Sequence, residues 1–128
     1  MMSWRKLHRW ALIGALAACA RSEGVDRRKL ASLVTPAEFA AGEALFNASC
    51  AACHGVRAGG SEVGPPLIHD YYKPSHHGDA AFLLAAQRGV IAHHWRFGNM
   101  PPVPAVTADE LASIIRYVRE VQKANGIE

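Results

Sequence analysis

The clearest pattern of apolar positions lies near the C-terminal end of the chain. Apolar residues recur there at the spacing of one helix face: Leu111, Ile114, Ile115, Val118 and Val121. Thr107 and Glu110 stand ahead of them at the spacing of a capping box, and Asn125-Gly126 follows them. Residues 107–126 therefore predict one long helix that turns an apolar face toward a core.

A second helix is expected to begin at the sequence TPAE, residues 35–38. Three residues there fit a cap, a first helical position and a capping-box partner: Thr35, Pro36 and Glu38. Phe39, Gly42 and Phe46 then fall on one face of the helix. Because Gly42 costs about 1 kcal/mol of helix stability relative to Ala, its place on the apolar face predicts that another helix crosses close to it.

Glycine and proline are frequent between these two helices. Residues 55–78 predict loops. Asp79 is expected to cap a short helix that stops at Gly89. Residues 90–97, VIAHHWRF, are ambiguous between loop and a further turn or two of helix. Residues 98–104, GNMPPVP, predict an extended loop, because three prolines in four positions cannot continue a helix. Since no alternating apolar pattern of useful length occurs, the expected fold is all-α with long loops.

The first twenty residues have the pattern of an export signal. A basic start with three cationic residues and no acid precedes an apolar run that is too short to span a bilayer. The sequence Leu16-Ala17-Ala18-Cys19 resembles a bacterial lipoprotein box, which implies cleavage before Cys19 and lipidation of that cysteine. Cleavage after Ala20 at an A-x-A site, which would remove Cys19, is the alternative. We favour the lipoprotein box.

The expected division of the chain follows from this signal. Residues 1–18 (alternatively 1–20) form the signal peptide, residues 19–34 form a tether that mixes charges with small residues, and residues 35–128 form one small domain. The whole chain has a formal charge of +3, but the signal carries three of its 14 basic residues and none of its 11 acidic ones. Because the mature chain is then formally neutral, no nucleic-acid partner is expected.

The most specific motif is C-x-x-C-H, formed by Cys50, Cys53 and His54. Two thiols at this spacing can each add to one vinyl group of a haem, and the histidine behind them can ligate the iron. A redox dithiol would need a preceding strand, and a zinc site would need further ligands at finger spacing. A disulfide is the remaining alternative. If Cys19 carries lipid and Cys50 and Cys53 hold haem, no free thiol is left to be oxidised outside the cytoplasm. The motif therefore predicts one covalently attached haem c.

Met100 is the only methionine that remains after the signal is removed. It lies in the proline-rich loop 98–104, whereas a methionine that only fills a core belongs on an apolar helix face. We therefore expect Met100 to be the second axial ligand of the haem iron, opposite His54.

Residues 36–124 resemble a class I cytochrome c. The matching pieces occur in order along the chain: Gly42 and Phe46, CAACH at 50–54, GPPL at 64–67, NMP at 99–101, and Tyr117. The resemblance implies three to four helices wrapped around the haem, with the first and last helices crossing where Gly42 meets Tyr117. It also implies that the Pro65 carbonyl accepts a hydrogen bond from Nδ1–H of His54. Residues 75–102 further resemble small monohaem cytochromes exported by proteobacteria.

The chain departs from the simple family pattern in its histidines: His69, His76, His77, His93 and His94. One interpretation places them at the surface or the haem edge, bonded to solvent, propionate or backbone. The other interpretations are an alternative sixth ligand, or a second metal site such as copper that would need both doublets together. Four residues can donate hydrogen bonds to the haem propionates: Tyr71, Tyr72, Trp95 and Arg96.

These features favour electron transfer over catalysis. A haem ligated by histidine and methionine has no open position for oxygen or peroxide. The expected partners are redox proteins of the periplasm (a respiratory complex, a dehydrogenase or an oxidase), with the membrane reached through the lipid and no small-molecule substrate. The alternatives are a ligand-binding or copper-handling haem protein, with a labile Met100 or the histidine pairs as ligands, and an accessory electron-entry subunit of a dehydrogenase or oxidase.

Overall fold

The computed structural model describes residue 30 and residues 32–128. The predicted export signal, Cys19 and most of the predicted tether lie outside the described residues. The all-α fold is confirmed, because residues 33–128 contain helices and no strand. The α-helices are α2 (Ala40–Ser49), α3 (Ala51–His54), α4 (Asp79–Arg88) and α5 (Ala108–Ala124). Three short 3-10 helices join them: η1 (Ala37–Phe39), η2 (Val56–Ala58) and η3 (Asp70–Tyr72).

Helix α5 is the longest of these helices, and its predicted capping box is present. The Thr107 hydroxyl accepts a hydrogen bond from the Glu110 backbone N–H, and the Glu110 carboxylate accepts one from the Thr107 backbone N–H at 2.8 Å. The helix ends at Ala124 with Asn125 as its C-cap, and Gly126 follows with φ +79°. One face of α5 is buried in the core, as the apolar spacing predicts: Leu111, Ile114, Ile115, Tyr117, Val118, Val121 and Gln122.

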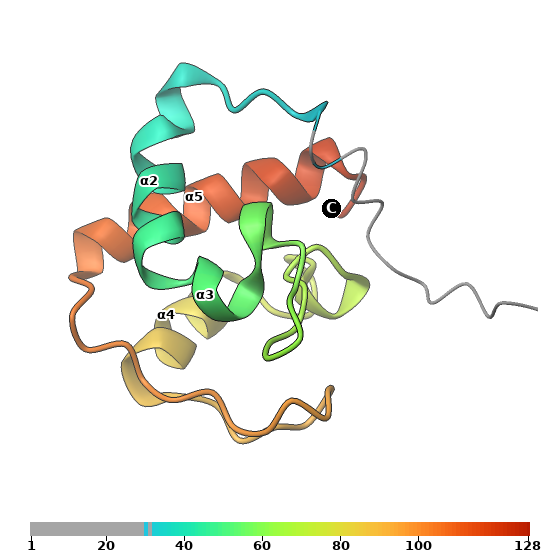
Figure 1. Ribbon diagram of the computed structural model, residues 1–128, viewed down its shortest axis with the longest axis vertical. Coiled ribbons are helices and arrows are strands. Elements are labelled where there is room, and N and C mark those ends of the chain that lie inside the picture. The colour runs from blue at the N-terminus through green and yellow to red at the C-terminus, as the bar shows by residue number, and fades with distance from the viewer. Residues whose placement is uncertain (1–29, 31) are drawn as a thin grey trace, which may run out of the picture.

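Helix α2 crosses α5 (Figure 1), and Gly42 lies at the close approach of the two helices, against Ser113 and Tyr117. A Cβ atom on Gly42 would lie 2.3 Å from the Ser113 carbonyl oxygen and 2.9 Å from Cβ of Tyr117. Phe46 and Tyr117 then pack ring against ring, with centroids 5.5 Å apart, and both side chains are fully buried. The expected crossing of the first and last helices at Gly42 and Tyr117 is therefore present.

The predicted capping box at the start of the first helix is wrong. Pro36 precedes the 3-10 turn η1, no side chain caps that turn, and α2 begins only at Ala40. The Phe39 backbone N–H donates instead to the Pro36 carbonyl oxygen at 2.9 Å. The tighter 3-10 turn thus occupies the place where Thr35 and Glu38 were expected to cap the α-helix.

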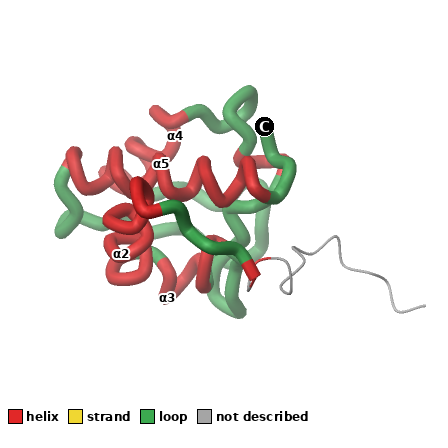
Figure 2. Tube along the Cα trace, turned by 90° about the horizontal axis from the view of Figure 1, so that it is seen from above, coloured by secondary structure: helices red, strands yellow, loops and turns green. Residues whose placement is uncertain are grey.

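Around α4, one expectation needs correction and one ambiguity is resolved. Asp79 is the first residue of α4 and Gly78 takes the cap position, while the Asp79 carboxylate binds Nε of Arg119 at 2.8 Å. Residues 90–97 add no helical turn after Gly89. Val90 pairs with Met100 in an isolated antiparallel bridge, and this pairing takes the backbone out of helical geometry. Figure 2 shows the long loops that join α3 to α4 and α4 to α5.

The described end of the predicted tether packs against the domain. Leu30 is 5% exposed and belongs to the core, and Leu33 lies partly buried beside it. The Arg57 guanidinium donates hydrogen bonds to the carbonyl oxygens of both leucines, at 2.9 Å for Leu30. These contacts attach the segment before η1 to η2, which follows the C-x-x-C-H motif.

Candidate functional site

A cavity of about 450 Å³ lies among α2, α3, α4, α5 and the loops around them. This volume falls within the range of roughly 300–1,000 Å³ that is typical of cofactor sites. The four residues expected to hold haem all line it: Cys50, Cys53, His54 and Met100. Most of the remaining wall is apolar and includes Phe46, Leu67, Phe82, Leu111 and Ile114.

The two cysteines reach the cavity from the junction of α2 and α3. Cys50 follows the last residue of α2 with φ −124° and ψ −33°, and its carbonyl oxygen accepts from the His54 backbone N–H at 2.9 Å. Both thiols are free, so no disulfide joins them. Burial raises the pKa of Cys50, and the neighbouring Cys53 raises it further.

The loop that contains Pro65 orients the imidazole of His54. Its Nδ1–H donates a hydrogen bond to the Pro65 carbonyl oxygen at 2.9 Å, the contact that the family resemblance implies. Because a carbonyl oxygen only accepts, this bond leaves the lone pair on Nε2, the nitrogen available to a metal. Burial lowers the pKa of His54, and the bond to Pro65 partly opposes that shift. Gly64 permits this approach, since a Cβ atom there would lie 2.5 Å from the Cys53 carbonyl oxygen.

Met100 lines the same cavity and has a fixed backbone. Its N–H donates to the Val90 carbonyl oxygen, and its own carbonyl oxygen accepts from the Val90 N–H, both at 2.9 Å. Gly89 makes room for this pairing: its φ is +74°, and a Cβ atom there would lie 2.5 Å from the Met100 carbonyl oxygen. The bridge therefore fixes the backbone of the loop that carries Met100 at the cavity.

These donors fit a covalently held haem. The cavity offers two free thiols for thioether bonds, an imidazole with an open Nε2, a thioether sulfur and an apolar wall for the porphyrin. The fold and the site thus define the class of c-type haem proteins. The family model "Cytochrome c" matches residues 39–122, and the chain belongs to that family, whose members bind haem c with its iron and transfer electrons. The comparisons with curated proteins and with solved structures gave no match.

The four expected propionate partners separate into two pairs. Tyr72 and Trp95 line the cavity, where Nε1–H of Trp95 donates to the Tyr72 hydroxyl at 3.0 Å. Tyr71 and Arg96 are exposed and are not among the residues that line it. Tyr71 instead stacks on His94, with ring centroids 4.4 Å apart and an interplanar angle of 19°.

The two histidine doublets, 17 positions apart in sequence, meet at the edge of the cavity. The ring centroid of His94 lies 5.3 Å from that of His76 and 5.1 Å from that of His77, and His77 lies 5.8 Å from His93. His77, His93 and His94 line the cavity, whereas His76 is exposed. Burial lowers the pKa of His94, and the neighbouring histidines lower it further.

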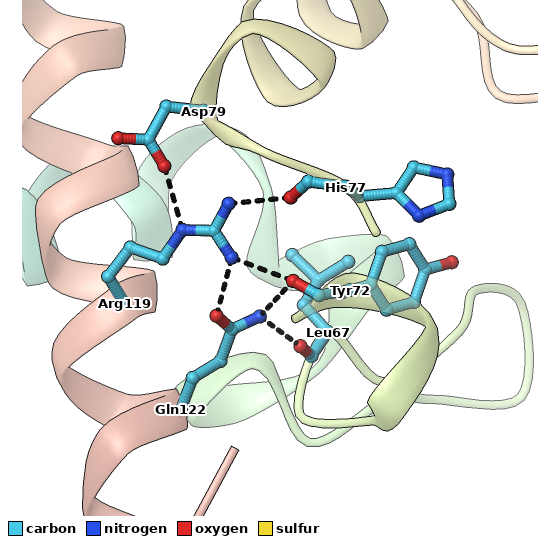
Figure 3. A network of polar contacts seen from close by, with 6 residues as sticks. All are labelled: Leu67, Tyr72, His77, Asp79, Arg119 and Gln122. Atoms are coloured by element: carbon cyan, nitrogen blue, oxygen red, sulfur yellow. Dashed lines mark hydrogen bonds and ion pairs between the residues drawn. The ribbon is translucent and has the colours of Figure 1, made fainter. Parts of the chain in front are cut away.

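Sequence reasoning missed a polar network on α5 that holds the cavity-lining loop (Figure 3). Arg119 donates to the carbonyl oxygens of Tyr72 and His77 at 2.7 and 2.6 Å. The fully buried Gln122 donates to the carbonyl oxygen of Leu67 at 2.7 Å and accepts from Arg119. One signal was available in the sequence, because Gln122 follows Val118 by four residues and therefore continues the apolar face of α5.

Proposed function

We propose that this cytochrome c is a one-electron carrier in which Cys50 and Cys53 hold the haem and His54 and Met100 ligate its iron. The observation that carries the proposal is that these four side chains line one apolar cavity, with Nδ1 of His54 already bonded to Pro65. When bound, the haem iron supplies an Fe(II)/Fe(III) couple. The chain supplies the ligands, the apolar wall and the exclusion of water.

The two proposed ligands would have distinct effects. The hydrogen bond from Nδ1–H to Pro65 makes His54 a better donor through Nε2. The soft thioether of Met100 favours the reduced metal and raises the potential. If His54 and Met100 both ligate the iron, no position on it would be left for oxygen or peroxide, which favours a carrier over an enzyme.

A spectrum of the Met100→Ala variant tests this ligand set. Oxidised wild-type protein should show the far-red band of methionine bound to Fe(III), and reduced wild-type protein should resist carbon monoxide. Met100→Ala should lose the band and bind carbon monoxide, whereas His93→Ala, at an exposed histidine that lines the same cavity, should behave as the wild type. If Met100→Ala keeps both wild-type properties, Met100 is not the ligand.

A redox partner would dock at the mouth of the cavity. Three large apolar side chains that line the cavity are exposed: Val63 is 62%, Leu84 43% and Phe97 41% exposed. Together with the formally neutral mature chain, these side chains support a transient contact through apolar surface. The proposed partners are a respiratory complex, a dehydrogenase or an oxidase of the periplasm.

We also propose that the mature protein is held at the membrane by lipid on Cys19. The support is the lipoprotein-like sequence at residues 16–19. Within the described part of the chain, no helix is long and apolar enough to cross a bilayer. Mass spectrometry of the mature N-terminus tests the anchor: an acylated Cys19 supports it, and a chain that begins at Arg21 contradicts it.

A further inference from the structure

Three imidazoles gather at the edge of the haem cavity and are not among the four residues expected to hold haem. His76 and His77 come from the loop before α4, and His94 comes from the loop after it. One ring nitrogen from each lies within 4.8 Å of the others. The fold thus joins two histidine doublets that the sequence left apart.

One nitrogen of this group lacks a partner. Nε2 of His94 is buried and has no hydrogen bond, and among the described residues it is the one buried side-chain nitrogen or oxygen in this condition. A buried polar atom without a partner costs about 1–3 kcal/mol, so such atoms call for an explanation. A bound cation at this nitrogen would provide one.

The other contacts hold two of the rings in place. Nδ1–H of His77 donates to the Tyr71 carbonyl oxygen at 2.5 Å, which leaves the lone pair on Nε2. Arg119 fixes the carbonyl oxygen of His77, and Figure 3 shows the imidazole pointing away from that contact. His94 is stacked on the Tyr71 ring. A backbone bond that sets the tautomer of a histidine is the usual support for a metal ligand.

We propose that His76, His77 and His94 form a second metal site, for one divalent first-row cation, with copper(II) bound more tightly than zinc(II). Imidazole nitrogens suit both ions, and affinity for nitrogen ligands peaks at copper. Three histidines with a fourth position for water are a common set. Ligand nitrogens around such an ion lie roughly 3.3 Å apart. The three ring nitrogens, which lie within 4.8 Å of one another, must therefore move closer together when the ion binds, and the exposed His76 can make this movement.

Two neighbouring histidines have other partners. Nδ1 of His93 lies 2.8 Å from the Ile91 carbonyl oxygen. Nδ1 of His69 accepts from the Tyr71 backbone N–H at 3.2 Å, and its ring packs edge-on against Trp95 at 4.9 Å. His69 therefore provides a matched control, because it belongs to the same aromatic group and lies outside the three proposed ligands.

Metal titration of the haem-loaded protein tests the site. Wild-type protein should bind one Zn²⁺ by calorimetry and one Cu²⁺ by electron paramagnetic resonance, with an unchanged haem spectrum. Because loss of a ligand's supporting contact alone weakens metal affinity 10–100-fold, His76→Gln and His94→Gln should each weaken it by at least about 100-fold. His69→Gln should bind as the wild type does. Since His76 is exposed, its variant keeps the fold.

Two results would overturn this site. One is a wild-type protein that binds neither ion more tightly than the His76, His77 and His94 triple variant. The other is a His69→Gln variant that loses as much affinity as His94→Gln. Neither result bears on electron transfer, because the haem spectrum reports the His54 and Met100 site separately.

Discussion

Arg119 of α5 holds the backbone of His77, with Nη2 2.6 Å from the His77 carbonyl oxygen. The same guanidinium binds the carbonyl oxygen of Tyr72, the side chain of Gln122 and the carboxylate of Asp79. One side chain of the last helix therefore fixes the loop that lines the haem cavity and carries two of the proposed metal ligands.

Replacing Arg119 by Ala should destabilise the haem-loaded protein by about 2–4 kcal/mol, because the part-buried carbonyl oxygen of His77 and the Gln122 side-chain oxygen would lose this donor and the Tyr72 carbonyl oxygen would keep only Gln122. Asp79→Ala is the matched control, since it removes only the exposed partner of the ion pair (69% exposed, against 17% for Arg119). Asp79→Ala should lower the free energy of unfolding by about 1 kcal/mol or less. Urea unfolding measures both values, and equal losses would contradict a central role for the guanidinium.

Gly42→Ala should destabilise the crossing of α2 and α5 by about 3 kcal/mol, because the added methyl group would overlap the backbone of Ser113. Gly78→Ala is the control. The φ of Gly78 is −65°, and the nearest atom to an added Cβ is 3.5 Å away. The free energy of unfolding of Gly78→Ala should stay within about 0.5 kcal/mol of the wild-type value. Thermal unfolding of both variants decides whether the close approach at Gly42 is the cause.

Gly89→Ala should disturb the position of Met100, because the new Cβ atom would meet the Met100 carbonyl oxygen. The expected signs are a weaker far-red band and faster reaction of the reduced protein with carbon monoxide. Gly98→Ala also places alanine at a positive φ, +87°, but nothing lies within 4 Å of its Cβ position. If Gly98→Ala affects the two signals as strongly as Gly89→Ala, backbone strain is responsible instead of the clash.

The capping box of α5 should make stability depend on pH. Hydrogen bonds from the backbone and side chain of Thr107 lower the pKa of Glu110 from its ordinary 4.5. A carboxyl group whose pKa is lower in the folded state stabilises that state above its unfolded pKa, and this contribution is lost as the pH falls through the folded pKa. The wild type should therefore exceed Glu110→Gln in stability at neutral pH, with a gap that closes below pH 4.5. A gap independent of pH would contradict this account.

The parts of the fold that could be predicted depend on local sequence. The apolar face and capping box of α5 lie within twenty residues. Gly42 on an apolar helix face likewise predicts that another helix crosses close to it. The C-x-x-C-H motif is local as well, because its spacing alone sets the chemistry of Cys50, Cys53 and His54.

The errors and omissions come from contacts between distant segments. Asp79 was expected as a cap, but Arg119, forty positions away, binds its carboxylate. Residues 90–97 were ambiguous as an isolated segment, and the pairing of Val90 with Met100 takes them out of helical geometry. A joint site of the two histidine doublets stayed one of several interpretations of the sequence, because only the loops on either side of α4 bring the doublets together.

An optical redox titration of the exported, mature protein tests the central claim most directly. We predict a haem spectrum that changes reversibly with potential as a single one-electron step, with the far-red band present only in the oxidised form. A colourless protein, or a haem that shows no reversible one-electron step, would contradict an electron carrier built on Cys50, Cys53, His54 and Met100.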